Sequence, residues 1–69
     1  MHSMETKTNN WHMVVKIGME VVATIDIQLP VGKFPFFRAK PILTAISSDT
    51  DAYIDCYLNN TFKLRVFND

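Results

Sequence analysis

The stretch EVVATIDIQL at residues 20–29 carries the clearest structural signal in this 69-residue chain. One set of alternate positions is entirely hydrophobic, namely Val21, Ala23, Ile25, Ile27 and Leu29. Because successive side chains of a β-strand point to opposite faces, this period of two predicts a strand buried on one face. Pro30 ends the strand, since proline has no N–H to donate to a sheet.

The preceding segment, WHMVVKI at residues 11–17, alternates in the same way, and the two segments together predict a β-hairpin. In the expected register Lys16 lies opposite Glu20, and Ile17, Gly18 and Met19 form the turn. Apolar residues then face each other, with Val15 opposite Val21, Met13 opposite Ala23 and Trp11 opposite Ile25. A single long strand bent at Gly18 is the alternative.

A second hairpin is predicted near the C-terminus, where residues 52–58 (AYIDCYL) and 62–67 (FKLRVF) also alternate. The best register pairs Leu58 with Phe62, Tyr57 with Lys63, Cys56 with Leu64, Asp55 with Arg65 and Ile54 with Val66. It requires a three-residue loop at 59–61. That loop places Thr61 in a left-handed conformation, which threonine adopts poorly, so we expect a nearby bulge to relieve the strain.

The middle of the chain is less regular. Residues 30–41 (PVGKFPFFRAKP) contain all three prolines and predict a loop or irregular crossover. A short strand is expected near 42–47, followed by turn-forming residues up to Asp51. A helix over 49–58, capped by Ser48, competes with the strand predicted at 52–58.

These elements predict an all-β domain over residues 11–69, preceded by a flexible tail at 1–10. About five short antiparallel strands would form a small barrel or a sandwich. The alternative is an α+β fold with the helix near 49–58.

Composition excludes several classes of function. The formal net charge is zero, so no overall field draws the chain to nucleic acid or to an anionic membrane. No apolar run approaches the ~20 residues of a membrane span, and no secretory leader is visible. Together with a single, unpaired cysteine, these features predict a cytoplasmic protein.

Small domains usually need a source of stability besides their core, which alone contributes only ~3–5 kcal/mol at this length. One cysteine cannot form an internal disulfide, and two histidines with one cysteine are too few for a structural zinc site. We therefore expect neither a metal nor a cofactor, and we expect the chain to form a homo-oligomer.

Candidate catalytic groups are few. Cys56 and His12 could form a nucleophile–base pair, but Cys56 lies on the hydrophobic face of its predicted strand. The acidic residues Asp49, Asp51 and Asp55 lack the central glycine and terminal glutamate of a calcium loop. Two glycines are also too few for a phosphate-binding loop. The sequence thus predicts a protein that is not an enzyme.

The candidate binding site is the connection at 30–41, where basic residues and phenylalanines interleave and acids are absent. Its members are Lys33, Phe34, Phe36, Phe37, Arg38 and Lys40. The phenylalanines could fold under the loop as a satellite of the core. They could instead form an exposed patch that docks on a protein partner or a second copy, since aromatic residues and arginine are enriched at interface centres. A third possibility is nucleic acid, with bases stacked on phenylalanine and phosphates held by the cations.

The expected function is a non-enzymatic protein-binding module that acts as a homo-oligomer. A small inhibitor or adaptor of viral or mobile-element type would have this character. The alternative is a small β-barrel that binds a nucleotide or oligonucleotide, with an affinity that falls steeply with salt.

Overall fold

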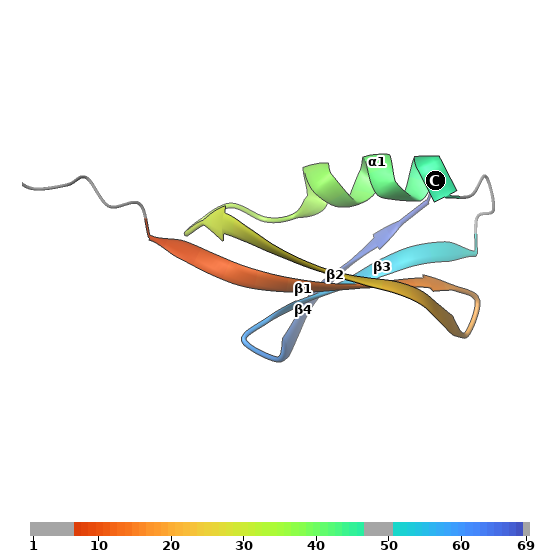
Figure 1. The fold of residues 1–69 in the computed structure, drawn as a ribbon, viewed down its shortest axis with the longest axis horizontal. Coiled ribbons are helices and arrows are strands. Elements are labelled where there is room, and N and C mark those ends of the chain that lie inside the picture. Colours follow the sequence, from red (N-terminus) through yellow and green to blue (C-terminus); the bar gives the residue numbers. More distant parts are fainter. Residues whose placement is uncertain (1–6, 47–50, 69) are drawn as a thin grey trace, which may run out of the picture.

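The computed structural model describes residues 7–46 and 51–68, which form a four-stranded sheet and one helix. The elements are β1 (Thr8–Ile17), β2 (Glu20–Pro30), α1 (Phe36–Ile46), β3 (Ala52–Leu58) and β4 (Thr61–Phe67). The strands are antiparallel in the order β2-β1-β3-β4, so β2 and β4 are the edges. Helix α1 lies along one face of the sheet and leaves the other face open (Figure 1).

This architecture corrects the predicted fold class. The domain is mostly β, but its sheet is open rather than closed into a barrel, and the described residues form four strands rather than about five. The strand expected near 42–47 is instead the second half of α1, up to Ile46. At 11 residues, α1 is also too short to cross a membrane, and no other helix occurs in the described ranges.

The helix begins directly after Pro35, which is buried and whose carbonyl accepts hydrogen bonds from the N–H groups of Arg38 and Ala39, at 3.0 and 2.9 Å. The sequence did not predict this helix because Pro41 lies inside it, at a position where proline removes a backbone hydrogen bond. The helical spacing of Ala39, Ile42, Leu43 and Ile46 was the available signal, since residues three and four apart share one side of a helix.

The predicted β1–β2 hairpin is confirmed, but its register differs. The turn is the two-residue Gly18-Met19, and Gly18 has a φ of 62°, which glycine adopts without a steric penalty. Val22 has no partner on β1 and forms a bulge, beyond which the pairs are Val15 with Ala23, Met13 with Ile25 and Trp11 with Ile27. From Val15 to Trp11 this shift of two positions keeps the side chains on their predicted faces. Val21, however, pairs with Lys16 and leaves the face predicted for it, and the predicted pair of Lys16 with Glu20 is wrong.

The β3–β4 hairpin is also confirmed, with the predicted pairs Ile54–Val66, Asp55–Arg65 and Cys56–Leu64. Its turn has two residues rather than three. Asn59 and Asn60 both have positive φ, 53° and 65°, as a type I′ turn requires. Lys63 is left without a partner on β3, and this bulge makes up the one-residue difference. Thr61 therefore pairs with Leu58 and does not take the left-handed position expected of it.

Two other boundaries differ from expectation. β1 begins at Thr8, so the last three residues of the predicted tail at 1–10 belong to the sheet, while residues 1–6 lie outside the described residues. The alternative helix over 49–58 is wrong from residue 52 onward, because β3 occupies that segment. Positions 47–50, including Ser48, lie outside the described residues.

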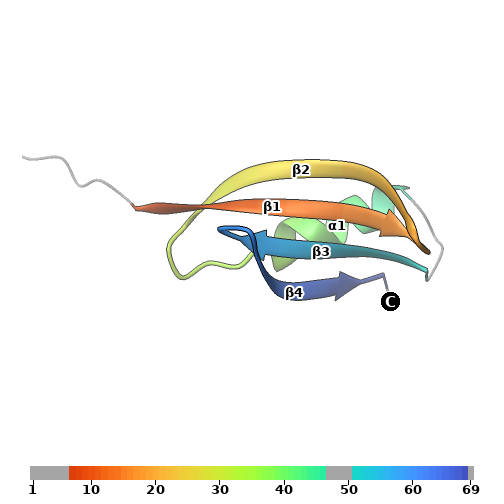
Figure 2. The same ribbon diagram turned by 90° about the horizontal axis from the view of Figure 1, so that it is seen from below.

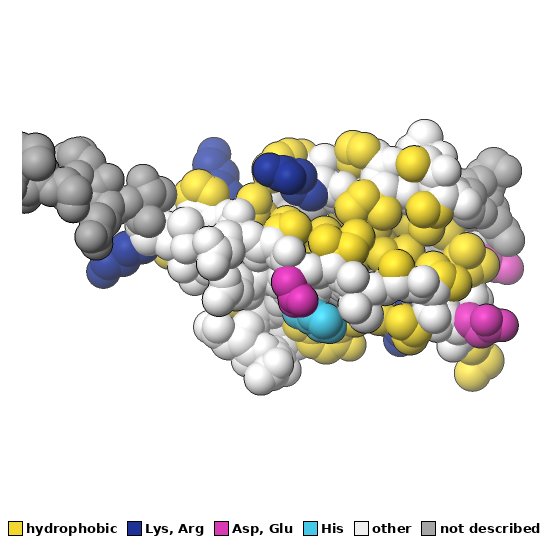
Figure 3. All heavy atoms as spheres, viewed as in Figure 1, with side chains coloured by type: hydrophobic (Ala, Val, Ile, Leu, Met, Phe, Trp, Pro, Cys, Tyr) yellow, Lys and Arg dark blue, Asp and Glu magenta, His cyan; other side chains and the backbone are white. Residues whose placement is uncertain are grey.

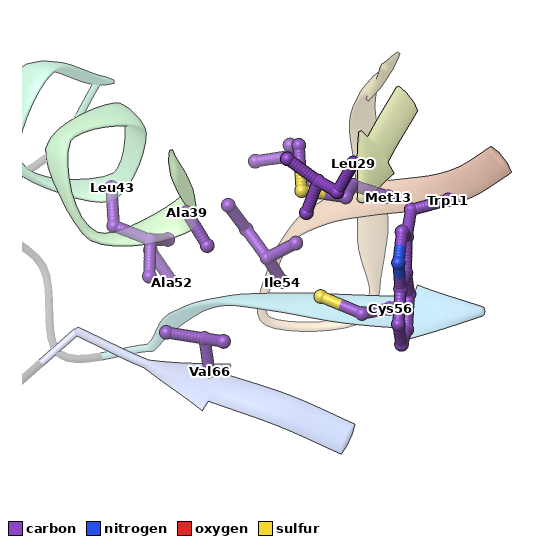
Figure 4. Packing of buried hydrophobic residues seen from close by; sticks show 10 residues of the cluster. Trp11, Met13, Leu29, Ala39, Leu43, Ala52, Ile54, Cys56 and Val66 are labelled. Atoms are coloured by element: carbon purple, nitrogen blue, oxygen red, sulfur yellow. The ribbon is translucent and has the colours of Figure 1, made fainter. Parts of the chain in front are cut away.

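The hydrophobic core lies between α1 and the sheet, and all four strands contribute to it, although the helix backbone approaches only β3 and β4. Its buried members are Trp11, Met13, Val15, Leu29, Ala39, Leu43, Ala52, Ile54, Cys56 and Val66 (Figure 4). Viewed through the sheet, α1 lies behind β1 and β3, with β2 off to one side (Figure 2). The helix therefore covers only part of the hydrophobic face of the sheet.

Candidate functional site

The six residues predicted to bind a partner divide between a loop and the helix. Two are in the loop before α1, and four are in the first half of α1: Lys33 and Phe34, then Phe36, Phe37, Arg38 and Lys40. All are exposed except Lys40, which is half-buried. The Lys40 Nζ donates a hydrogen bond to the Phe67 carbonyl at 2.8 Å and so ties α1 to the end of β4.

The three phenylalanines of this group have different surroundings. The Phe34 ring lies against the buried Trp11 indole, with 5.5 Å between ring centroids, but Phe34 is itself 56% exposed. Phe36 and Phe37 are 52% and 55% exposed. Their rings are approached by cations, Lys40 at 5.8 Å and Arg38 at 5.5 Å, at distances within cation–π range.

The outer side of α1 is apolar, which is unusual for a helix on the surface of a small domain. Ala39 and Leu43 point into the core, whereas Phe37, Pro41 and Ala45, spaced four apart, are all exposed. Polar side chains occur in this helix only at Arg38, Lys40 and Thr44. We call Phe36, Phe37, Pro41 and Ala45 the α1 outer surface.

A second apolar area adjoins the helix where it leaves β2 uncovered. Along the core face of β2, Leu29 is buried, Ile27 and Ile25 are half-buried, and Ala23 is exposed. Ile42 on α1 is half-buried and packs against the core, and Ile46, one turn later, is exposed. A broad hydrophobic area is visible between the helix and β2 (Figure 3). We call Ala23, Ile25, Ile27, Ile42 and Ile46 the α1–β2 surface.

The open face of the sheet is polar and aromatic, and sequence reasoning missed it as a site. One row across the strands contains Asp26, His12, Tyr57 and Phe62. The His12 Nδ1 lies 2.7 Å from the Asp26 Oδ1, and the ring centroids of Tyr57 and Phe62 are 5.8 Å apart. A shallow pocket of about 270 Å³ lies here, lined by these first three residues and by Asn10, Trp11, Asn59 and Asn60.

The next row is organised by Asp55, whose carboxylate is buried between two cations. It accepts hydrogen bonds from Arg65 Nε at 2.6 Å and Nη2 at 3.3 Å, and the Lys16 amino group lies 3.6 Å away. The hydrogen bond to Asp55 raises the pKa of Arg65 above its ordinary value. The same guanidinium lies 4.5 Å from the centre of the Tyr53 ring. In the sequence, this face was indicated by the polar residues at alternate positions of each strand.

The possible nucleophile–base pair of Cys56 and His12 is not assembled. Cys56 is buried in the core beside Met13, whereas His12 lies on the open face. Burial, with a smaller contribution from Asp55, raises the pKa of the Cys56 thiol to about 11, so the reactive thiolate is scarce at neutral pH. Within residues 7–46 and 51–68, no three His, Cys, Asp or Glu side chains gather as metal ligands would.

The chain matches no family model, no curated protein and no solved structure.

Proposed function

We propose that this protein is a non-enzymatic protein-binding module that contacts its partner through the α1 outer surface and acts as a homo-oligomer. The observation that carries the proposal is the exposure of Phe36 and Phe37 at the start of a helix whose outer side is apolar. These rings add little to the core, yet burying a phenylalanine side chain is worth ~1.5–3 kcal/mol. Such exposed rings are better explained by a role in binding a partner protein than by a role in stabilising the fold.

The chemistry of this surface favours a protein as the partner. Phe37, Pro41 and Ala45 form a ridge four residues apart, the spacing with which a helix fills a hydrophobic groove. Arg38 lies beside Phe37 and is suited to the edge of such a contact, because arginine and aromatic residues are enriched at interface hot spots.

The test uses two matched double variants. Phe36→Ala with Phe37→Ala removes the rings of the α1 outer surface, and Phe62→Ala with Phe67→Ala removes β4 rings that are 49% and 53% exposed. Each tagged protein is captured from cells of its own source, and co-purifying proteins are quantified by mass spectrometry. We expect the first variant to lose a specific partner at least tenfold, while the second retains it and both keep the wild-type circular dichroism spectrum. Retention of all partners by the first variant would refute the proposal.

A second candidate function rests on the open face of the sheet. Tyr57 and Phe62 lie side by side there, and the guanidinium of Arg65 lies between Asp55 and Tyr53. Aromatic rings on which bases stack, with cations for phosphates, are how proteins bind single-stranded nucleic acid. Oligonucleotide binding therefore stays a candidate function, although the fold is an open sheet and not the barrel expected with it.

Fluorescence anisotropy with a labelled single strand of roughly ten nucleotides, within the usual site size, tests this second function. Binding that weakens strongly between 50 and 200 mM salt, and that is lost in the Phe62→Ala with Phe67→Ala variant, would favour it. Absence of binding at low salt would exclude it.

A further inference from the structure

We infer that two copies of this chain pair antiparallel through their β2 strands, joining their sheets into one. The inference deepens the proposed function, since it names the surface by which the module self-associates. β2 is an edge strand, and from Ala23 to Leu29 it pairs regularly with β1 on one side only, with no other described strand beside it. The unpaired N–H and C=O groups of such an edge are a template for another strand.

Between the bulge at Val22 and Pro30, this edge has one charged side chain, Asp26, and few of the other features by which proteins usually prevent strand addition. Residues 23–29 (ATIDIQL) contain no proline, no lysine and no bulge, and the bulge at Val22 lies nearer the turn. The other edge, β4, is protected. It is shorter, has a bulge at Lys63, and its end is tied to α1 by the hydrogen bond from Lys40 to the Phe67 carbonyl. The asymmetry directs pairing to β2.

The occupant is a second copy because β2 is complementary to itself. An antiparallel pair centred on Ile25 places Ile25 opposite its own counterpart, Ala23 opposite Ile27 and Thr24 opposite Asp26. The apolar side chains of both core faces then meet, and no like charges are opposed. A pair centred on Asp26 would instead oppose two carboxylates, which is destabilising.

The pairing also accounts for the α1–β2 surface. Ile25 and Ile27, which α1 leaves half-buried, would gain neighbours from the second copy on the same face of the joined sheet. With only one cysteine, the chain has no internal disulfide to supplement its small core. The α1 outer surface takes no part in this contact, so a dimer would present two partner-binding helices.

Introducing a charge at Ile25, the residue that would face its own counterpart, tests the pairing. Sedimentation velocity at micromolar concentrations should give the wild type twice its monomer mass of 7.9 kDa. Ile25→Glu and Ile25→Lys, measured separately, should be monomeric, since each opposes like charges. An equimolar mixture should recover the dimer, because Glu then faces Lys across the axis. Recovery also shows that both variants fold. A wild type that stays monomeric, or a mixture that stays monomeric, would overturn the inference.

A cross-linking variant gives a second measurement that does not depend on charge. Ile25→Cys in a Cys56→Ala background should form a disulfide between copies on mild oxidation, because facing residues of an antiparallel pair have Cα atoms ~4.5–5.5 Å apart, within disulfide range. Phe62→Cys in the same background is the control and should stay uncrosslinked. Equal cross-linking at both positions would contradict β2 pairing.

The two proposals fail separately in these experiments. A β2 variant that is monomeric yet still captures the α1 partner would leave the proposed function intact. A Phe36→Ala with Phe37→Ala protein that dimerises but captures nothing would leave the β2 inference intact.

Discussion

Asp55 and Arg65 face each other across β3 and β4, and the Arg65 Nε lies 2.6 Å from the Asp55 Oδ1. Asp55 is 1% exposed, while the Arg65 side chain reaches solvent. Lys16 on β1 is the second cation, at 3.6 Å. This one buried carboxylate therefore links three neighbouring strands on the open face.

Removing Arg65 should destabilise the protein more than removing Lys16. Arg65→Met leaves the buried Asp55 with only the longer contact to Lys16, and an underpaired buried charge is costly. We expect the midpoint of thermal unfolding to fall by at least ~5 °C, against less than half of this for Lys16→Met. Circular dichroism melts measure both. Equal shifts would mean that the two cations are equivalent.

Alkaline pH should destabilise the protein through Cys56. Its folded pKa of about 11 lies above the ordinary value of 9.0, so the folded state binds the thiol proton more tightly than the unfolded state. The stabilisation is complete below pH 9 and is lost as pH rises through 11, by up to ~3 kcal/mol at ~1.4 kcal/mol per unit. Urea unfolding of the wild type, compared with Cys56→Ala between pH 8 and 11, measures the difference. Parallel pH profiles of the two proteins would contradict the prediction.

The Asn59-Asn60 turn should tolerate glycine but not alanine. Both residues have positive φ, which costs an alanine ~1–2 kcal/mol and a glycine nothing sterically. We expect Asn60→Ala to lower the free energy of unfolding by about 1 kcal/mol, and Asn60→Gly to leave it within about 0.5 kcal/mol. Asn10→Ala, an exposed position in β1, is the control. Indistinguishable alanine and glycine variants would argue against the type I′ turn.

Trp11, the only tryptophan, reports on the loop before α1. Its indole is buried and packs on Phe34, so its fluorescence emission should lie at short wavelength. Phe34→Ala should shift the emission by ~5 nm or more to the red as water reaches the indole. It should also lower the free energy of unfolding by ~1 kcal/mol, because the aromatic pair is lost. Phe37→Ala should change neither the emission wavelength nor the free energy of unfolding, because that ring lies on the α1 outer surface.

The alternating segments predicted the strands and most of their buried faces, because a period of two survives the two-residue register error between β1 and β2. The pair of Asp55 with Arg65 was predicted for the same reason. The error in β4 is one residue, and it places Phe62 on the open face beside Tyr57. The positions of the bulges could not be predicted from the sequence. The Val22 bulge changed the partners of Trp11 and Met13, and no residue of the sequence marks it.

The helix could not be predicted because local signals conflicted. The three prolines of residues 30–41 indicated a loop, whereas the tertiary contacts of Ala39 and Leu43 favour a helix over the sheet. The open face was missed for a different reason. Its members, such as His12 and Tyr57, come from separate strands and meet only when β1 pairs with β3.

The strand order has a consequence for how quickly the chain can fold. Each hairpin closes a two-residue turn, a local event that takes ~1–10 μs. β1 and β3, however, join residues as distant as Trp11 and Leu58, with β2 and α1 between them in the chain. The loss of chain entropy before this contact forms makes the meeting of the two preformed hairpins the slow step. The kinetic barrier to folding thus lies at the centre of the sheet, where β1 pairs with β3 and the two hairpins join.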